Sequence, residues 1–319
     1  KALAGMTKDA PKRHHWWPVC VSKHWADSDG GVHWILPDGN VRRARPDSFG
    51  VIGNGHSIKL NEPGETSPWD QNYEAEFQAA DDAFPRVIEW LDGLERAGPP
   101  FEIPRQERIL PQQITDEQFL DLLQCVVSLA VRSPMHRERS VSLAEHLRGP
   151  LPERERNNLI GANMRNAQRD AVKVIRGRGK FMAIFSPERE FHFGDGFFHN
   201  ISPPVQHLHA PKILVPVTPW LTVLFTCPMS FRTQPRLCTM TATADEAAAL
   251  NRVVQVYAKN QLFYRSEKPA LEEAYRSGRH LEFSDDRNPA DDLFYSVPGV
   301  DARDDSLDWL GEFIAQSRP

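Results

Sequence analysis

The residues from 191 to 211 concentrate side chains that bind metal ions and transfer protons. One aspartate and four histidines stand there: His192, Asp195, His199, His207 and His209. Imidazole and carboxylate groups are ligands for divalent ions, and histidine also exchanges protons near neutral pH. This composition predicts either a reaction site or a polar edge of a sheet.

The candidate metal ligands are Asp195, His199, His207 and His209. His207 and His209 would face the same side of a strand, and Asp195 and His199 would approach each other within one helical turn. A divalent ion, Mg²⁺, Mn²⁺ or Zn²⁺, is therefore the cofactor that we expect. The prolines at 203, 204 and 211 favour the alternative, a solvated polar loop.

Three residues outside this segment are candidate catalytic groups together with Asp195. His14 and His15 would point to opposite faces of a strand, so that one of them enters a site and the other does not. Glu74 flanks the apolar stripe of a predicted helix, where partial burial makes a carboxylate useful as an acid, a base or a ligand. The alternatives are a histidine that bonds a carbonyl and a solvated helix flank.

A basic stripe is the candidate substrate-binding surface. Its members recur at steps of four, four and three on one face of a predicted helix: Arg165, Arg169, Lys173 and Arg176. Such a stripe in helix 153–180 could follow the phosphates of a nucleic acid or a nucleotide, or it could pair with acids of the same chain. Arg132, at the end of an apolar helix, would clamp a carboxylate or phosphate, or cap that helix.

Composition narrows the class of protein. The chain has 319 residues and a net charge of -5, which conceals an excess of seven positive charges over 132–180 and of seven negative charges over 267–319. The acidic end predicts a protein partner or self-association.

No apolar run spans a membrane, no secretory segment is recognisable, and the four cysteines form no C-x-x-C pair, so we expect a cytoplasmic protein. Serine-hydrolase, P-loop, zincin and dinucleotide-binding motifs are absent.

The elements that must position these residues predict an α+β fold, a mixed or antiparallel sheet with a helical middle and a C-terminal helix packed on it. Strands are expected at 32–43 (a hairpin), 181–185, 190–193, 212–217 and 221–227, and helices at 71–96, 116–132, 153–176, 243–264 and 306–316. We expect residues 1–12 to be a disordered tag, 13–266 one domain, and 267–319 an acidic extension with a docking helix.

Short motifs in this order resemble a bacterial family, domain-of-unknown-function family 4238. They are His14-His15-Trp16-Trp17-Pro18, the hairpin ending at Val41-Arg42-Arg43, Asn72-Tyr73-Glu74, Arg132-Ser133-Pro134, Phe193-Gly194-Asp195-Gly196 and Leu250-Asn251. The resemblance covers about residues 13–266 and makes Asp195, His14 or His15, and Glu74 the favoured site residues. Gly-Asp-Gly replaces the family's Ser-Asp-x-Pro, and the family carries no assigned activity.

The functional expectation is a metal-assisted or His/Asp-based hydrolase acting on a phosphodiester, in nucleic acid or a nucleotide. A bound divalent ion would lower the pKa of an attacking water. A place in bacterial defence or toxin-like systems is compatible with this chemistry. The alternative is a non-catalytic sensor or partner-binding protein, in which the same residues maintain the fold.

Overall fold

A computed structural model describes residues 13–53, 57–58, 71–98, 103–201, 211–228, 231–278 and 289–300. These residues form an α+β fold, as predicted. The helices are α1 (Val19–Ser22), α2 (Ala75–Asp92), α3 (Asp116–Arg132), α4 (Pro134–Arg148), α5 (Glu153–Ile175), α6 (Ala244–Tyr257), α7 (Glu273–Arg276) and α8 (Pro289–Ser296). The strands are β1 (Arg13–His15), β2 (Val32–Ile35), β3 (Val41–Ala44), β4 (Val51–Gly53), β5 (Ser57–Ile58), β6 (Gln71–Asn72), β7 (Ile109–Gln112), β8 (Lys180–Phe185), β9 (Phe193–Gly194), β10 (Lys212–Thr218), β11 (Leu221–Thr226), β12 (Leu237–Thr241) and β13 (Leu262–Tyr264).

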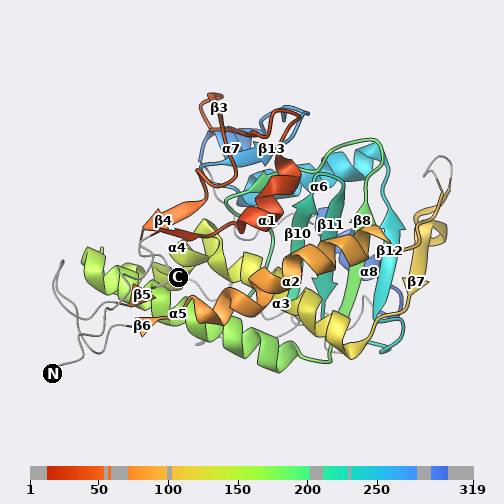
Figure 1. The fold of residues 1–319 in the computed structure, drawn as a ribbon, viewed down its shortest axis with the longest axis horizontal. Helices are drawn as coiled ribbons and strands as arrows, with labels where there is room; N and C mark the ends of the chain where they lie inside the picture. The colour runs from red at the N-terminus through yellow and green to blue at the C-terminus, as the bar shows by residue number, and fades with distance from the viewer. Residues whose placement is uncertain are drawn as a thin grey trace, which may run out of the picture.

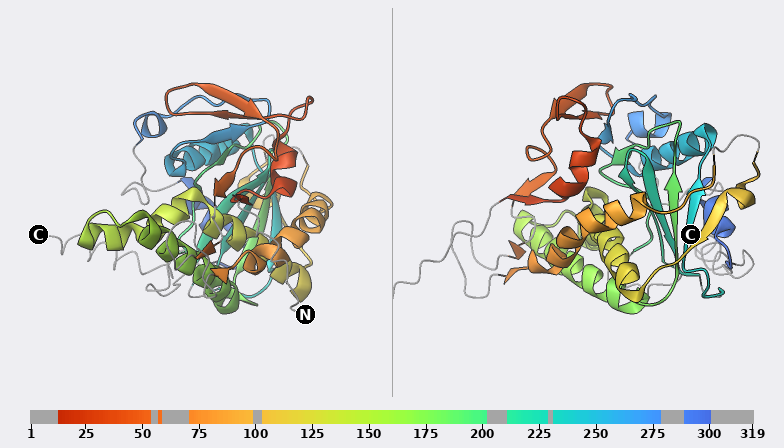
Figure 2. Two further views of the ribbon diagram at one scale, coloured as in Figure 1. Left: turned by 60° about the vertical axis from the view of Figure 1, so that its left-hand side comes forward. Right: turned by 45° about the vertical axis from the view of Figure 1, so that its right-hand side comes forward.

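The larger sheet has the strand order β10-β11-β8-β12-β7. Its strands β8 and β12 run parallel, and the other neighbouring pairs are antiparallel. Strands β8 and β11 are buried along their whole length, which is why their sequences are apolar without alternation. Helices α2 and α3 cross one face of this sheet, and α8 lies on the other (Figures 1 and 2).

The helical middle of the chain contains the predicted helices α2, α3 and α5 and one that was not predicted, α4. Thr115 and Gln118 make the expected capping box, and α3 then runs buried to Arg132. Helix α2 contains Pro85 without ending there. Helix α5 covers most of the predicted basic segment and ends before Gly177, which has a φ of +75°.

The second sheet has the order β3-β2-β13-β9 and lies beyond one end of the larger sheet (Figure 1). Its hairpin β2-β3 confirms the predicted turn, in which Gly39 has a φ of +86°. An aromatic cluster joins the sheet to the N-terminal segment, since the ring centroids of Trp17 and Phe193 are 4.3 Å apart and those of Trp17 and Phe263 are 4.7 Å apart. The cluster explains the tryptophans at the start of the chain.

Three predicted elements are shorter than expected. The helix predicted at 71–96 is limited to α2, because 71–72 form the strand β6 and the helix ends at Asp92. The strand at 190–193 is limited to β9, because Asn251 of α6 bonds the backbone nitrogen of His192 and the carbonyl of Glu190 in place of a neighbouring strand. The helix that begins after Thr243 ends at Tyr257 and not near Tyr264, because 262–264 form the buried strand β13.

The described residues after 266 pack against both hydrophobic clusters of the fold. The Tyr275 hydroxyl donates to the carbonyl of Ile35, and the Phe294 ring lies 5.4 Å from that of Phe198. The helix predicted at 306–316 lies outside the described residues. Among the described helices, none combines the length and the apolar composition that crossing a membrane would need.

Candidate functional site

Asp195 lies in a buried loop after β9, and its carboxylate is bonded to the main chain. Oδ1 accepts the amide of Lys259 at 2.7 Å, and Oδ2 accepts the amide of Asn260 at 2.9 Å. Lys259 and Asn260 follow the C-terminal end of α6. The Asp195 carboxylate therefore anchors the segment that leaves this helix. Burial raises the pKa of Asp195 to about 6, although the amide bonds act in the opposite direction.

The two glycines beside Asp195 are required by close packing. A Cβ on Gly196 would stand 2.0 Å from the carbonyl oxygen of Tyr257, and a Cβ on Gly194 would stand 2.5 Å from the carbonyl oxygen of Gly196. Both contacts are with backbone atoms, which cannot rotate away. The Gly-Asp-Gly sequence therefore lets the loop approach the C-terminal end of α6 closely enough for Asp195 to reach its amides.

His199 lies beside His136 of α4, with 5.6 Å between the ring centroids. Both side chains are fully buried, and none of their four ring nitrogens makes a hydrogen bond of good geometry to a described residue. Burial lowers the pKa of His136 to about 3 and that of His199 well below its usual value, with Arg139 acting in the same direction. The backbone of Ile201 partly offsets the lowering for both rings.

The other predicted catalytic residues that the structure describes, His15 and Glu74, lie on separate elements. His207 and His209 lie outside the described residues, as does the side chain of His14. His15 is half-buried at the end of β1, and Glu74 is the half-buried N-cap residue of α2. Two of the expected metal ligands, Asp195 and His199, are described. Asp195 binds backbone amides, whereas His199 packs against His136. The described residues contain no group of three or more histidine, cysteine or acidic side chains placed to bind a metal.

Arg132 binds a carboxylate of its own chain. Its guanidinium forms a two-pronged ion pair with Asp81 of α2, with nitrogen–oxygen distances of 2.5 and 3.1 Å. The Arg132 side chain is 1% exposed and stacks over the ring of Phe77 at 4.9 Å, whereas Asp81 is 36% exposed. Arg132 therefore connects α3 to α2. Its predicted role in binding a substrate stays a prediction.

Three members of the basic stripe line a common hollow of about 310 Å³ between α2, α3 and α5. Arg169 and Lys173 belong to α5, Arg176 is the residue that follows its last turn, and Gln124 and Gln168 add carboxamides. Arg169 also forms an ion pair with Glu76 at 3.0 Å. Arg165, the fourth predicted member, is half-buried and interacts electrostatically with Tyr73 instead. We call this hollow, defined by its lining residues, the basic hollow.

The basic hollow contains polar groups that the fold itself does not use. No described carboxylate forms an ion pair with Lys173 or Arg176, and both are exposed. Gln168 is 4% exposed, and its Oε1 has no hydrogen-bond partner within the described part of the chain. Small residues of α2, including Ala79 and Ala80, leave the space open.

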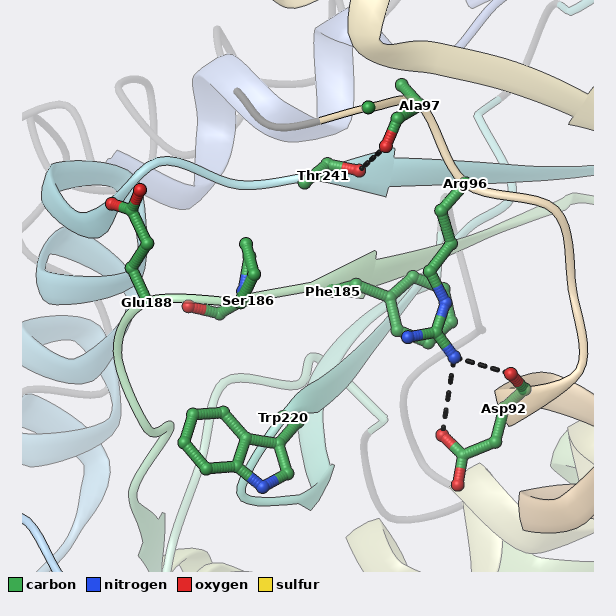
Figure 3. A pocket seen from close by; sticks show the side chains of 10 residues that line it. Asp92, Arg96, Ala97, Phe185, Ser186, Glu188, Trp220 and Thr241 are labelled. Carbon is green, nitrogen blue, oxygen red and sulfur yellow. Dashed lines mark hydrogen bonds and ion pairs between the residues drawn. The ribbon is translucent and has the colours of Figure 1, made fainter. Parts of the chain in front are cut away.

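A larger hollow of about 760 Å³ lies where α2 ends near the carboxyl ends of β8 and β12 (Figure 3). Phe185, Trp220 and Arg96 line it, together with Ser186, Glu188 and Thr241. The sequence reasoning missed these residues, since they come from four separate segments. One sequence feature could have indicated this hollow. Trp220 stands in the turn between two apolar strands, where a small polar residue is more usual.

Comparison of the chain with family models, curated proteins and solved structures gives no match. The resemblance to family 4238 therefore stays a prediction, and the function is argued from the geometry of the described residues.

Proposed function

We propose that this protein binds a phosphate-bearing ligand, nucleic acid or a nucleotide, in the basic hollow. The observation that carries the proposal is the position of Arg169, Lys173 and Arg176, which line one hollow together with two carboxamides. Guanidinium and ammonium groups bind phosphate oxygens, and carboxamide N–H groups add uncharged donors. Glu76 reduces the positive charge, and its pairing with Arg169 leaves Lys173 and Arg176 as the principal phosphate contacts.

The spacing of the cations favours a backbone over a single phosphate. Residues 169 and 173 lie in the last turns of α5 and Arg176 directly follows it, so the three span about 10 Å along the helix axis. Successive phosphates of one strand lie about 3.4 Å apart along the axis of a duplex, so at least two of them fit this span. A single-stranded oligonucleotide is therefore the ligand with which the proposal is tested first.

The experiment is fluorescence anisotropy with a labelled 20-nucleotide single-stranded DNA, the same sequence as RNA, and the duplex, over a range of salt concentrations. The variant Lys173→Glu/Arg176→Glu should weaken binding at least about tenfold and reduce the salt dependence by about two phosphate contacts. The matched control is Arg42→Glu/Arg45→Glu, which makes the same change of charge on exposed residues at β3.

Equal losses in the two double variants would mean that net charge alone governs binding and would reject the basic hollow. The basic hollow would also be rejected if the wild-type protein showed no binding at about 50 mM salt, where phosphate contacts are strongest. A normal far-UV spectrum for both variants ensures that folding is not the cause.

Metal-assisted phosphodiester hydrolysis is the second candidate function, and the His136–His199 pair favours it. Two imidazoles on one tetrahedral ion stand about 5 Å apart, close to the observed 5.6 Å between centroids. Neutral histidines are also the form that binds metal. Arg139 opposes a bound cation, and the hydrolase proposal needs further ligands than these two.

Elemental analysis of the purified protein tests this candidate. We expect about one zinc or manganese per chain, and cleavage of a labelled oligonucleotide when Mn²⁺ is added, both lost in His136→Ala and His199→Ala and retained in His146→Ala. His146 is the exposed histidine of the same helix. Little metal and no cleavage would reject the hydrolase and favour a non-catalytic binding protein, which we expect to act in the cytoplasm, where free thiols persist.

A further inference from the structure

Two carboxamides line the basic hollow without forming a hydrogen bond to any described residue. Gln124 of α3 is half-buried, and Gln168 of α5 is 4% exposed. A buried polar group without a partner lowers the stability of a fold, so native proteins rarely retain one. These carboxamides therefore point to a partner that comes from outside the chain.

The carboxamides lie on helix faces that meet in the hollow. Gln124 is one turn from Leu120 on α3, Gln168 is one turn from Val172 on α5, and all four side chains line the same space. Helix α2 contributes Ala80 and packs against both of the other helices (Figures 1 and 2). Each helix thus adds small or apolar side chains beside the polar ones.

The two carboxamides differ in what they offer a ligand. Among their polar atoms, only Oε1 of Gln168 is both covered by neighbouring atoms and without a partner in the described part of the chain. Gln124 can therefore both donate to a ligand and accept from it, whereas Gln168 can donate through Nε2. A ligand that fits this arrangement carries a donor and acceptors on one polar edge.

The cations of the hollow lie nearer to solvent than the carboxamides. Lys173 and Arg176 are exposed, whereas Gln168 is buried. A nucleotide unit has the same order of groups, because its phosphate is solvated and its base has apolar faces and a polar edge. The volume of about 310 Å³ is at the lower end of the usual range for ligand pockets, which favours a single base.

We propose that the basic hollow holds one unpaired adenine of the strand whose phosphates Lys173 and Arg176 contact. Gln124 accepts from the adenine N6 amino group and donates to N7, the pairing by which carboxamides read adenine in nucleic-acid complexes. Gln168 donates to a further ring nitrogen, and the apolar side chains cover the faces of the ring. A base inside a duplex is stacked and cannot enter a hollow, so the base is unpaired.

Gln124 and Gln168 are thus specificity-determining residues of the same site, and this inference rests on the proposed function. The phosphate contacts provide affinity for any strand, and the carboxamides select the base. Removal of a carboxamide should therefore change the preference among bases and not the salt dependence of binding.

The test is fluorescence anisotropy with labelled homopolymers of deoxyadenosine, deoxycytidine and thymidine, each of about 20 nucleotides, over a range of salt concentrations. We expect the wild type to bind the adenine strand at least about fivefold more tightly than the other two, the discrimination of one bidentate contact. Gln124→Leu and Gln168→Leu should each lower this preference at least about threefold and leave the salt dependence unchanged. The matched control Gln78→Leu makes the same change at an exposed glutamine of α2 outside the hollow, and it should keep the preference.

Thermal unfolding separates this role from a structural one. Gln168→Leu replaces an unpaired buried carboxamide with an apolar side chain, so its unfolding midpoint should equal or exceed that of the wild type. A lowered midpoint with an unchanged preference would show that Gln168 maintains the fold, and would overturn its role in base selection.

The outcomes also separate this inference from the phosphate-binding proposal. If no strand binds at about 50 mM salt, both fail. If the three strands bind equally and Lys173→Glu/Arg176→Glu weakens all of them, the basic hollow binds phosphates and the adenine inference is rejected. A wild-type preference for cytosine or thymine would reject it as well, and so would an adenine preference that both glutamine variants retain.

Discussion

Oδ1 of Asp195 lies 2.7 Å from the backbone nitrogen of Lys259, and this hydrogen bond connects the loop after β9 to the chain that leaves α6. The second oxygen accepts the next amide, at Asn260. An aspartate that resembles a catalytic residue in the sequence thus holds two distant segments together.

Replacement of Asp195 should destabilise the fold. Asp195→Ala leaves two buried amides without acceptors, and we expect a loss of about 2–5 kcal/mol in the free energy of unfolding. Asp195→Asn keeps the shape and one acceptor, so its loss should be about 1–3 kcal/mol. Urea unfolding at pH 7 measures both. Stability equal to wild type in both variants would contradict the anchoring role and favour a catalytic one.

The ionisation of Asp195 also makes the stability of the fold depend on pH. Its folded pKa of about 6 is above the unfolded value of 3.8, so its favourable contribution is present below pH 3.8 and is lost as the pH rises through 6. The stability difference between wild type and Asp195→Asn should therefore shift against the wild type between pH 4 and pH 6, by up to about 1.4 kcal/mol per pH unit. A difference that does not change with pH would show that Asp195 has no such shift.

Gly196→Ala should be strongly destabilising, because the added methyl group would meet the Tyr257 carbonyl at 2.0 Å. We expect a loss of about 3 kcal/mol or more, or insoluble protein. Gly98→Ala is the matched control, since its methyl group would meet nothing within 4 Å. Thermal unfolding of the two variants compares them, and similar midpoints would contradict the packing argument.

The buried pair His136 and His199 should make the protein sensitive to acid. Their pKa values are lower in the folded state than the usual 6.5, so the unfolded chain binds more protons below that pH and stability falls as the pH falls. Each histidine contributes a slope of up to about 1.4 kcal/mol per pH unit. His136→Phe should reduce the slope between pH 6.5 and 4, and His146→Phe should not. Identical slopes in wild type and His136→Phe would refute this.

The Arg132–Asp81 pair should respond unequally to loss of either partner. Asp81→Ala leaves a guanidinium that is 1% exposed without its counter-charge, and we expect a loss of about 3 kcal/mol or more. Arg132→Met leaves Asp81, which is 36% exposed and can be hydrated, so the loss should be smaller. The double variant should be more stable than Asp81→Ala. Urea unfolding completes the cycle, and a larger loss in Arg132→Met would contradict this account.

Local elements were predictable from the sequence because their causes are local. The capping boxes at Thr115 and Thr243 depend on residues three positions apart, and the Gly39 turn depends on one positive φ. The periodicity of apolar residues likewise located α2. The boundaries at 190–193 and after Tyr257 were wrong because distant groups, Asn251 and the strand β13, decide them.

The sequence by itself determined which residues have metal-binding, acidic or basic side chains, and on which helix face the basic stripe lies. Only the tertiary structure decided the partners: Asp195 bonds the amides of Lys259 and Asn260, Arg132 binds Asp81, and His199 meets His136. The physical reason is that a side chain's chemistry depends on burial and on neighbours, and these come from segments more than fifty residues away. Spacing along the chain records periodicity within one element and not the contacts between elements.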